Sequence, residues 1–378
     1  MLGGVLGSLA DTTVISAGLS AAGHTDRRSR VLTGVVTVAA ILGLCLFRRE
    51  NYDLVLARVL TGSRRAIDGG PPTGQALSTA RARLAAGGMR SVFEQAATVM
   101  PQPGPGSYAF GLLVTAFDGT VFDLAATADI TAELATPSAG RFPQARLVTL
   151  VACGTRWVLA ARLGSSALSE QHLVDQLADT LAPGTLNLAD RNFFSMARWV
   201  RFTATGAHLA WRVKNGAKSL PARIMRVLSD GSAMVRLRES DAMLSARRVK
   251  TGDRSLPRLP DTLARLVELT LAVTDSTGRA RTSRFRILTT LLDHEQYPAD
   301  QIAAVYAERW QAEVIYLRVK ATLRGAGTRL RGQTPALAVQ VIWGLLTVYN
   351  ALVGLAVAAA VVLGVDPDEK SPSPPSSP

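Results

Sequence analysis

Four side chains suited to binding a metal ion or a phosphate lie in the segment YAERWQAEVIYLRVKATLRG, residues 306–325: Tyr306, Arg309, Glu313 and Lys320. At about 100° per residue, an α-helix would gather all four within an arc of about 60°. A carboxylate among basic groups on a partly apolar face indicates a site that meets both a metal and a phosphate. An amphipathic helix with an Arg309–Glu313 ion pair explains the same residues, and this geometry alone favours neither interpretation.

Two aspartates elsewhere in the chain each end a short apolar segment. Asp118 lies in VTAFDGTVFDLA, and Asp190 lies in LNLADRNFFS, where Arg191 follows it. A carboxylate at the end of a strand leaves the sheet toward solvent, and carboxylate oxygens are the ligands that hard divalent ions prefer. Taken alone, Asp118 is better explained as a turn residue and Asp190 as a helix cap.

The composition favours a polyanionic partner. The 378-residue chain has 42 Lys and Arg against 29 Asp and Glu, a net charge of +13, which indicates nucleic acid or an anionic membrane surface. Residues 191–229 include eight basic and no acidic residues, as expected for contacts with a phosphate backbone. The two cysteines and four histidines are scattered without metal-ligand spacing, which argues against a zinc enzyme.

The pattern of apolar residues divides the chain into segments that would position these groups. In residues 1–105 the apolar residues have helical spacing, and the Pro- and Gly-rich segment PQPGPG at 101–106 then interrupts regular structure and marks a domain boundary. The pattern then changes to short strands, with one predicted pair turning at Asp118-Gly119. Residues 207–292 are rich in strands, with a hairpin signal at Asp230-Gly231. A long helix is predicted from Asp300 to Leu323.

The spacing Tyr-x2-Arg-x3-Glu-x6-Lys over residues 306–320 resembles the signature of the DDE transposases of bacterial insertion sequences, specifically the insertion-element-4 family. VTAFDGTVFDLA is similar to the first acidic motif of that family, and LNLADRNFFS is similar to the second. FPQARLVTLVACGT and LRGQTPALAVQVIWGLLTVYNAL also resemble it. The resemblance extends over about residues 25–365, and three motifs in the right order make it specific.

The resemblance implies an α/β fold: an RNase H-like mixed-sheet catalytic core interrupted by a β-rich insertion, with an all-helical N-terminal domain. It assigns residues 1–105 to the helical, DNA-binding N-terminal domain. The catalytic core would comprise residues 106–212 and 293–365, the second part with the C-terminal helices, and the insertion would comprise residues 213–292. Residues 366–378, rich in Pro and Ser, are predicted to be a disordered tail.

The resemblance further implies a transposase that binds the ends of its element and catalyses metal-dependent cleavage and transfer of DNA strands. Asp118, Asp190 and Glu313 would be the catalytic residues and would hold two Mg²⁺ or Mn²⁺ ions, as two-metal-ion phosphodiester transfer requires. DNA-binding roles are implied for Tyr306, Arg309, Lys320 and Arg191. The expected partners are double-stranded DNA, as terminal inverted repeats and target, and a second copy of the chain in a synaptic homodimer.

Three alternatives remain open at this point. An inactive relic that binds DNA without cutting it would fit residues 125–128, AATA, where the family usually carries another polar or acidic residue, and the Pro/Ser tail. A nuclease without strand joining would use the same carboxylates. A membrane-associated basic protein would fit residues 339–365, which are long and apolar enough to cross a bilayer, although Gln340 and Asn350 interrupt them. The transposase interpretation predicts a cytoplasmic, nucleoid-associated protein without stable membrane association.

Overall fold

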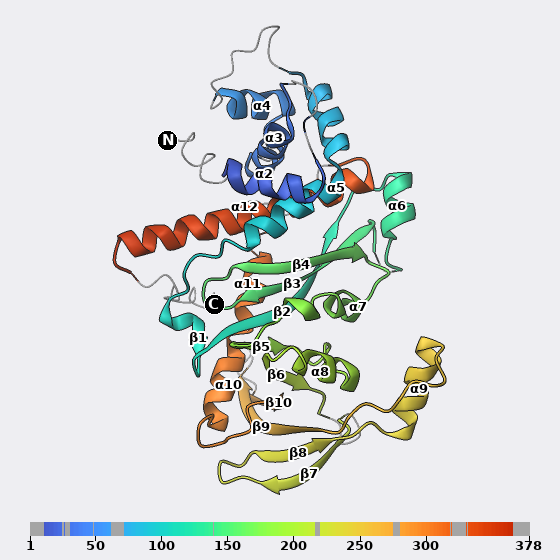
Figure 1. The fold of residues 1–378 in the computed structure, drawn as a ribbon, viewed down its shortest axis with the longest axis vertical. Coiled ribbons are helices and arrows are strands. Elements are labelled where there is room, and N and C mark those ends of the chain that lie inside the picture. The colour runs from blue at the N-terminus through green and yellow to red at the C-terminus, as the bar shows by residue number, and fades with distance from the viewer. Residues whose placement is uncertain are drawn as a thin grey trace.

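The computed structural model describes residues 11–24, 26, 31–47, 49–61, 72–138, 140–215, 220–274, 280–317, 319, 330 and 332–365. The N-terminal helices and the last helix lie over one end of a long mixed sheet, and the strand-rich insertion lies at the other end (Figure 1). Lys320 and the predicted tail lie outside the described residues.

The regular structure described in the first hundred residues is helical. They are α2 (Thr12–Ala21), α3 (Gly34–Leu46), α4 (Tyr52–Thr61) and α5 (Gly74–Ala97). Asp11, Thr33 and Thr73 cap three of these helices, because each side chain accepts a backbone N–H from the first turn. The predicted helical character of the N-terminal region is confirmed.

Helix α5 is kinked at Ala85, whose φ of 53° and ψ of −177° interrupt the helix. The amide of the buried Gln340 donates to the carbonyls of Arg81 and Ala85, at 3.0 Å each, and accepts from Arg81 Nε at 2.9 Å. These bonds give partners to backbone groups near the kink, where buried carbonyls would otherwise be costly. They also join α5 to the last helix, α12 (Pro335–Val362).

The described strands form one mixed sheet in the order β4-β3-β2-β5-β6-β10-β9-β8-β7, with β1 beside β2. Strand β2 is parallel to β5, and β5 is parallel to β6, whereas β10 pairs with β6 antiparallel. The strands are β1 (Tyr108–Ala109), β2 (Leu112–Asp123), β3 (Gln144–Ala152), β4 (Val158–Ser165), β5 (Thr185–Ala189), β6 (His208–Val213), β7 (Ala222–Val227), β8 (Ala233–Leu237), β9 (Thr262–Thr274) and β10 (Ala280–Thr289). The insertion therefore extends the core sheet.

Alternating side chains give the central strands two apolar faces. Ala116 and Leu188 belong to the core shared with α5, α11 (Trp310–Leu317) and α12. Phe117 belongs to the core shared with α7 (Glu170–Asp175) and α8 (Met196–Thr203). Asp118 and Asp190 lie two positions after Ala116 and Leu188, so we assign their side chains to the α11 face of the sheet.

The predicted turn at Asp118-Gly119 is wrong. Strand β2 is continuous from Leu112 to Asp123, and Asp118 and Gly119 pair with Thr149 and Val148 of β3. A long antiparallel partner holds the Asp-Gly step extended, and that partner lies some thirty positions further along the chain. Asp118 is consequently a mid-strand residue whose backbone is fixed on one side by β3.

The long helix predicted from Asp300 to Leu323 is also broken. Helix α10 (Ala299–Ala307) ends before α11 begins at Trp310. The N–H groups of Glu308 and Arg309 bond to carbonyls three residues back, at 2.9 and 3.2 Å. Because such a turn is tighter than an α-helical one, the predicted arc of side chains does not continue unchanged across it.

The strand-rich insertion contains a helix that the sequence patterns did not predict. Helix α9 (Asp241–Thr251) begins after Ser240, whose hydroxyl accepts the N–H of Met243, and ends at Gly252 in a left-handed conformation with φ of 72°. The Ser and Gly are the usual start and stop signals of a helix. Both residues can be read from the sequence, but the strand-like pattern of the surrounding residues favours a strand-rich interpretation of the whole segment.

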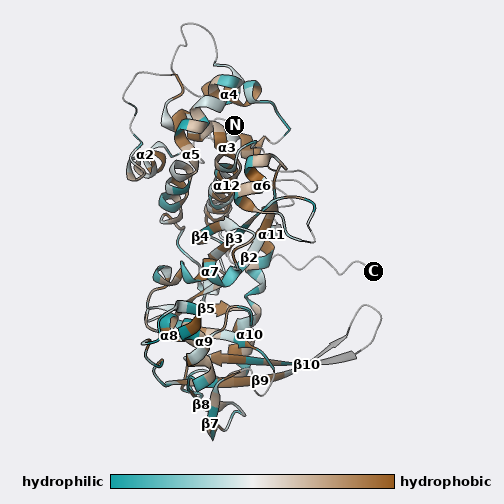
Figure 2. Ribbon diagram, turned by 90° about the vertical axis from the view of Figure 1, so that its right-hand side faces the viewer, coloured by the Kyte–Doolittle hydropathy of each residue, from teal (hydrophilic) through white to brown (hydrophobic). Residues whose placement is uncertain are grey.

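Helix α12 is the one helix among the described residues that is long and apolar enough to cross a membrane. It packs against α3, α5 and α6 (Ala128–Leu134) (Figure 1, Figure 2). Its polar residues have partners inside the protein: the Asn350 amide accepts from the N–H of Val158 and donates to the Val158 carbonyl, both at 2.9 Å. A role in the core therefore explains the apolar run.

Candidate active site

Two of the predicted catalytic residues lie on neighbouring parallel strands: Asp118 within β2 and Asp190 directly after the end of β5. In the register between β2 and β5, Thr115 lies beside Asn187 and Ala116 beside Leu188. Asp118 and Asp190 come two positions after this last pair along their respective segments, so they lie beside each other. Neighbouring strands lie about 4.8 Å apart, so the sheet brings these two carboxylates to one place on its α11 face.

Asp118 has the most perturbed carboxyl group of the site. Burial raises its pKa to about 6; the N–H of Gly119 and the charge of Arg309 oppose the rise, whereas Glu313 and Glu170 add to it. Two other charged residues of the predicted signature are therefore close enough to Asp118 to affect its ionisation. Burial makes ionisation of this carboxyl group unfavourable, and ionisable groups with strongly shifted pKa values cluster at functional sites.

Helix α11 and the turn before it supply the basic and acidic partners of Asp118. Arg309 Nη2 lies 2.7 Å from Glu313 Oε1. The hydroxyl of Tyr316 donates to the backbone carbonyl of Asp118 at 2.6 Å and lies 2.7 Å from Thr149 Oγ1. Because Tyr316 is buried, these two bonds fix α11 against β2 and β3 and so fix where Glu313 stands. Sequence reasoning missed this positioning residue, because nothing near Tyr316 along the chain identifies Asp118 and Thr149 as its partners.

Tyr306 and Asp190 lie on the neighbouring side of the site. The Tyr306 hydroxyl donates to the carbonyl of Ala189 at 3.3 Å, one residue before Asp190. Burial raises the pKa of Tyr306 to about 12, and the charges of Arg309, Asp190 and Arg212 also act on it. Arg212 Nη1 lies 3.7 Å from Asp190 Oδ1. Arg191 is exposed, and nothing described ties it to the site.

The three carboxylates match the chemistry of hard divalent ions, which prefer oxygen ligands. Glu313 raises the pKa of Asp118, because the two negative charges repel each other. A cation bound between them would relieve this repulsion. Among the described residues, no three acidic, histidine or cysteine side chains stand close enough to enclose an ion. Asp190 and Glu313 face Arg212 and Arg309 instead. The donor set fits two divalent ions in chemical type, and its assignment stays a prediction.

The Glu170 side chain packs against Gly119, the residue that follows Asp118. A Cβ atom at Gly119 would lie 2.7 Å from Glu170 Oε1 and 2.8 Å from its Cδ. The Glu170 carboxylate accepts from Asn192 Nδ2 at 2.9 Å and lies 3.7 Å from Arg146 Nη1. Glu170 therefore braces the loop after β5 from the α7 side of the sheet. Sequence reasoning missed it, because it lies far from Asp118 and Asp190 along the chain.

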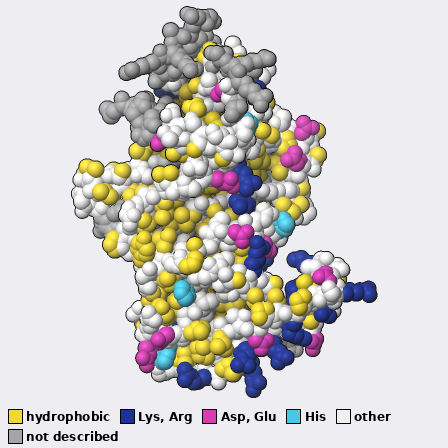
Figure 3. All heavy atoms as spheres, viewed as in Figure 1, with side chains coloured by type: hydrophobic (Ala, Val, Ile, Leu, Met, Phe, Trp, Pro, Cys, Tyr) yellow, Lys and Arg dark blue, Asp and Glu magenta, His cyan; other side chains and the backbone are white. Residues whose placement is uncertain are grey.

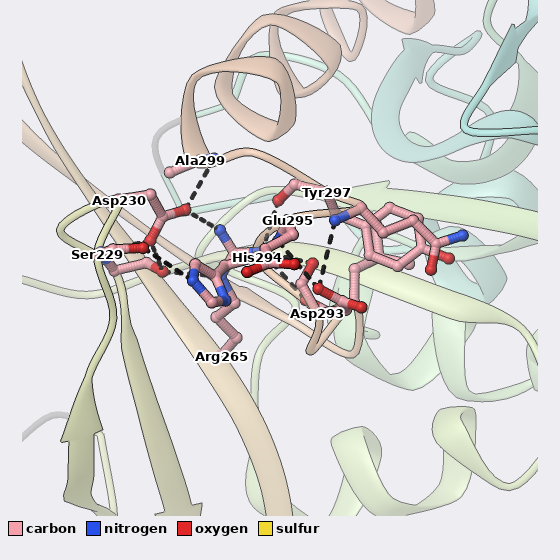
Figure 4. A network of polar contacts seen from close by, with 11 residues as sticks. Ser229, Asp230, Arg265, Asp293, His294, Glu295, Tyr297 and Ala299 are labelled. Atoms are coloured by element: carbon pink, nitrogen blue, oxygen red, sulfur yellow. Dashed lines mark hydrogen bonds and ion pairs between the residues drawn. The ribbon is translucent and has the colours of Figure 1, made fainter.

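The insertion anchors the start of α10, as the polar network in Figure 4 shows. Asp230, in the turn between β7 and β8, contacts the guanidinium of Arg265 and accepts the N–H of Ala299 at 3.1 Å. Arg265 is fully buried and also donates to Ser232 Oγ at 2.8 Å and to the Tyr297 carbonyl at 2.6 Å. The helix pair that carries Arg309 and Glu313 therefore begins on a charge network supplied by the insertion.

Replacing Asp118 by Asn is expected to stabilise the metal-free protein by about 1–3 kcal/mol near pH 8. The pKa of Asp118 is about 6 in the folded protein, above its ordinary value of 3.8. Ionisation of this carboxyl therefore opposes folding once the pH exceeds 3.8. The gain should shrink as the pH falls through 6 and vanish below about pH 4. Urea unfolding in EDTA at three pH values measures it, and a gain independent of pH would contradict the assignment.

Comparisons with known proteins identify the family to which these motifs belong. Residues 3–94 match the family model of the insertion element 4 transposase N-terminal region, and residues 109–351 match that of the transposase DDE domain. The transposase InsG for insertion sequence element IS4 of Escherichia coli K12 is 27% identical over 354 residues, which cover 91% of this chain and 74% of that relative.

A solved structure shows the same fold. The piggyBac transposase, in a cryo-EM synaptic complex with hairpin DNA, superposes with a TM-score of 0.51 at 7% identity, over 96% of this chain and 76% of that one. This likeness confirms the predicted RNase H-like α/β fold.

The DDE-domain match spans more than half of the chain and includes Asp118, Asp190 and Glu313. A DDE domain entails binding to DNA and dependence on divalent metal ions in general terms. The prediction of a transposase enzyme is confirmed over the membrane-associated alternative. The chain therefore belongs to the insertion-element-4 family of DDE transposases.

Proposed function

We propose that this transposase binds the ends of its element and cuts and joins DNA strands, with Asp118, Asp190 and Glu313 holding two Mg²⁺ or Mn²⁺ ions. The observation that carries the proposal is the meeting of Asp118 and Asp190 on neighbouring parallel strands, with Glu313 acting on the ionisation of Asp118. Bound divalent ions supply an activated attacking oxygen and neutralise charge on the leaving oxygen. Tyr316 and Glu170 keep the strand ends and α11 in place.

The basic residues of the site are proposed to hold the DNA backbone. Arg309 offers a planar fork that matches a phosphate, and Tyr306 can donate to a phosphate or stack on a base. Arg191 and Lys320 keep the DNA-binding roles that the resemblance gave them. We assign the same role to exposed basic residues of the insertion around α9, β7 and β8, where such side chains gather (Figure 3): Arg223, Arg226, Arg236, Arg238, Lys250 and Arg254.

The division of labour follows the predicted domains. Residues 1–105 would bind the terminal inverted repeats, residues 106–212 and 293–365 would catalyse, and residues 213–292 would add backbone contacts. The finer partners are double-stranded element ends, target DNA and a second copy of the chain in the synaptic complex. Because these partners include DNA, we propose that the protein is cytoplasmic and associated with the nucleoid.

The test is cleavage of DNA that carries the repeats flanking the gene. With Mg²⁺ or Mn²⁺, the purified protein should release ends with a 3′-hydroxyl, and these ends should join to a target plasmid; with EDTA it should bind the ends and leave them intact. Binding without cleavage under either metal would overturn the catalytic proposal in favour of an inactive relic. Cleavage without joining would show a nuclease.

A further inference from the structure

The turn between β3 and β4 reaches the helix that carries Glu313. In this turn, Arg156 Nε donates to Gln311 Oε1 at 2.8 Å. Gln311 is the second residue of α11 and lies between Arg309 and Glu313 along the chain. The two bonded residues are 155 positions apart in the sequence, so only the fold brings them together, and no motif of the sequence contains Arg156.

The backbone of Arg156 has a conformation that favours glycine. Its φ is 60°, and a residue with a side chain is strained in this left-handed region unless its surroundings hold it there. The hydroxyl of Tyr349, a buried residue of α12, donates to the Arg156 carbonyl at 3.0 Å. Asn350 bonds both the N–H and the carbonyl of Val158, two positions further on. Helix α12 therefore holds the turn, and strain of this kind is often found where the side chain has a function.

Helix α11 is fixed at its two ends by different parts of the fold. Tyr316 attaches its second half to β2, through the carbonyl of Asp118. Its first turn follows the break after α10, and the N–H groups of Gln311 and Ala312 bond to carbonyls three residues back, at 2.9 and 3.1 Å. This tighter turn has poorer hydrogen-bond geometry than an α-helical one, so a side-chain contact there matters more. Glu313 lies between the two fixed points.

We propose that Arg156 is a positioning residue of the active site: by holding Gln311 it sets the place of Glu313, and thereby the affinity of the site for divalent ions. Residues that orient metal ligands in this way change metal affinity or activity by about 10- to 100-fold when they are replaced. Arg156 acts through Gln311 and needs no contact with the metal or the DNA. This inference rests on the proposed function, because it takes Glu313 as a metal ligand.

Replacing Arg156 by Gly tests the inference, because glycine removes the side chain and adopts the left-handed backbone without strain. The fold should therefore survive. In the metal-free protein, hydrogen–deuterium exchange of the amides of residues 310–314 should become about tenfold faster, whereas exchange in α8 stays parental. Binding of Mn²⁺ to the DNA-free protein should weaken about tenfold. Single-turnover cleavage should slow by about 10- to 100-fold, with parental binding of element ends in EDTA.

Two glutamine variants complete the design. Gln311→Ala removes the acceptor of the same bond and should reproduce the three changes seen in Arg156→Gly. The double variant should be about as impaired as Arg156→Gly alone, because both changes remove one shared contact. Gln301→Ala is the matched control, since it makes the same chemical change at an exposed side chain of α10. It should match the parent in exchange, Mn²⁺ binding and cleavage.

Parental exchange in α11 or parental Mn²⁺ binding in Arg156→Gly would overturn the inference, as would losses that add up in the double variant. Faster exchange throughout the protein, with a lower urea midpoint, would show that Arg156 has only a structural role. A parent that binds Mn²⁺ and never cuts would refute the catalytic proposal, whereas weaker Mn²⁺ binding by Arg156→Gly would still support the positioning role.

Discussion

Replacing Glu313 by Gln is expected to reduce DNA cleavage by about a thousandfold or more, while binding of element ends stays within about threefold of the parent. A glutamine keeps the size of the side chain and an oxygen that can accept from Arg309, 2.7 Å away from Glu313 in the parent. The fold of α11 should therefore survive. What is lost is the negative charge that a divalent ion needs from this position.

The measurement for Glu313→Gln is single-turnover cleavage at saturating protein, with end binding measured separately in EDTA. Glu133→Gln makes the same chemical change on the exposed face of α6 and should cut at the parental rate. Loss of Mn²⁺ binding in Glu313→Gln, read by titration of the DNA-free protein, would tie the lost rate to the metal site. Parental cleavage by Glu313→Gln would show that Glu313 is not a metal ligand.

The sequence was sufficient for features whose determinants are local. The hairpin at Asp230-Gly231 joins β7 and β8 as predicted, because the glycine takes a left-handed conformation with φ of 79°. Strands β3 and β4 also pair antiparallel across the short turn at Gly154-Thr155. In each case a turn signal lies directly between two apolar runs, so neighbouring residues contain the information.

The sequence was insufficient where a distant segment determines the outcome. Asp118-Gly119 is extended because it pairs with β3. The residues around Asp118 contain no signal that predicts this pairing. The break at Glu308-Arg309 has no proline or glycine to mark it. Arg212 enters the site only because β6 lies beside β5. The motif residues could thus be named from the sequence, whereas the residues that hold and orient them needed the fold.

The largest expected effect on stability is that of Asp230→Ala, which should lower the free energy of unfolding by about 3–5 kcal/mol. Arg265 has no exposed surface, and Asp230 is its carboxylate partner. Without Asp230 the buried guanidinium would lose its ion-pair partner and keep only neutral hydrogen-bond acceptors. The N–H of Ala299 at the start of α10 would also lose its acceptor. Because α10 leads into the turn with Arg309, cleavage should fall with stability.

Asp253→Ala is a closely matched control, since Asp253 makes the same local turn without the buried partner. Asp253 Oδ1 accepts from the N–H and hydroxyl of Ser255 at 2.8 and 2.6 Å, and Asp230 Oδ1 accepts from those of Ser232 at 3.1 and 2.5 Å. Asp253→Ala should therefore destabilise the protein much less than Asp230→Ala does. Urea unfolding of both variants at pH 7 measures the difference, and equal losses would show that the Arg265 pair contributes little.

The pH dependence gives a second check on the same pair. Burial opposes ionisation of Asp230, but bonds from Ser232 and the charge of Arg265 outweigh it and hold its pKa below the ordinary value of 3.8. The carboxylate therefore stabilises the fold above that pH, and its contribution is lost as the pH falls through the lowered pKa. The gap in stability between the parent and Asp230→Ala should be constant from pH 8 to about pH 5 and narrow only in stronger acid. A gap that narrows already between pH 7 and about pH 5 would mean that another group, and not this carboxylate, holds Arg265 and the start of α10.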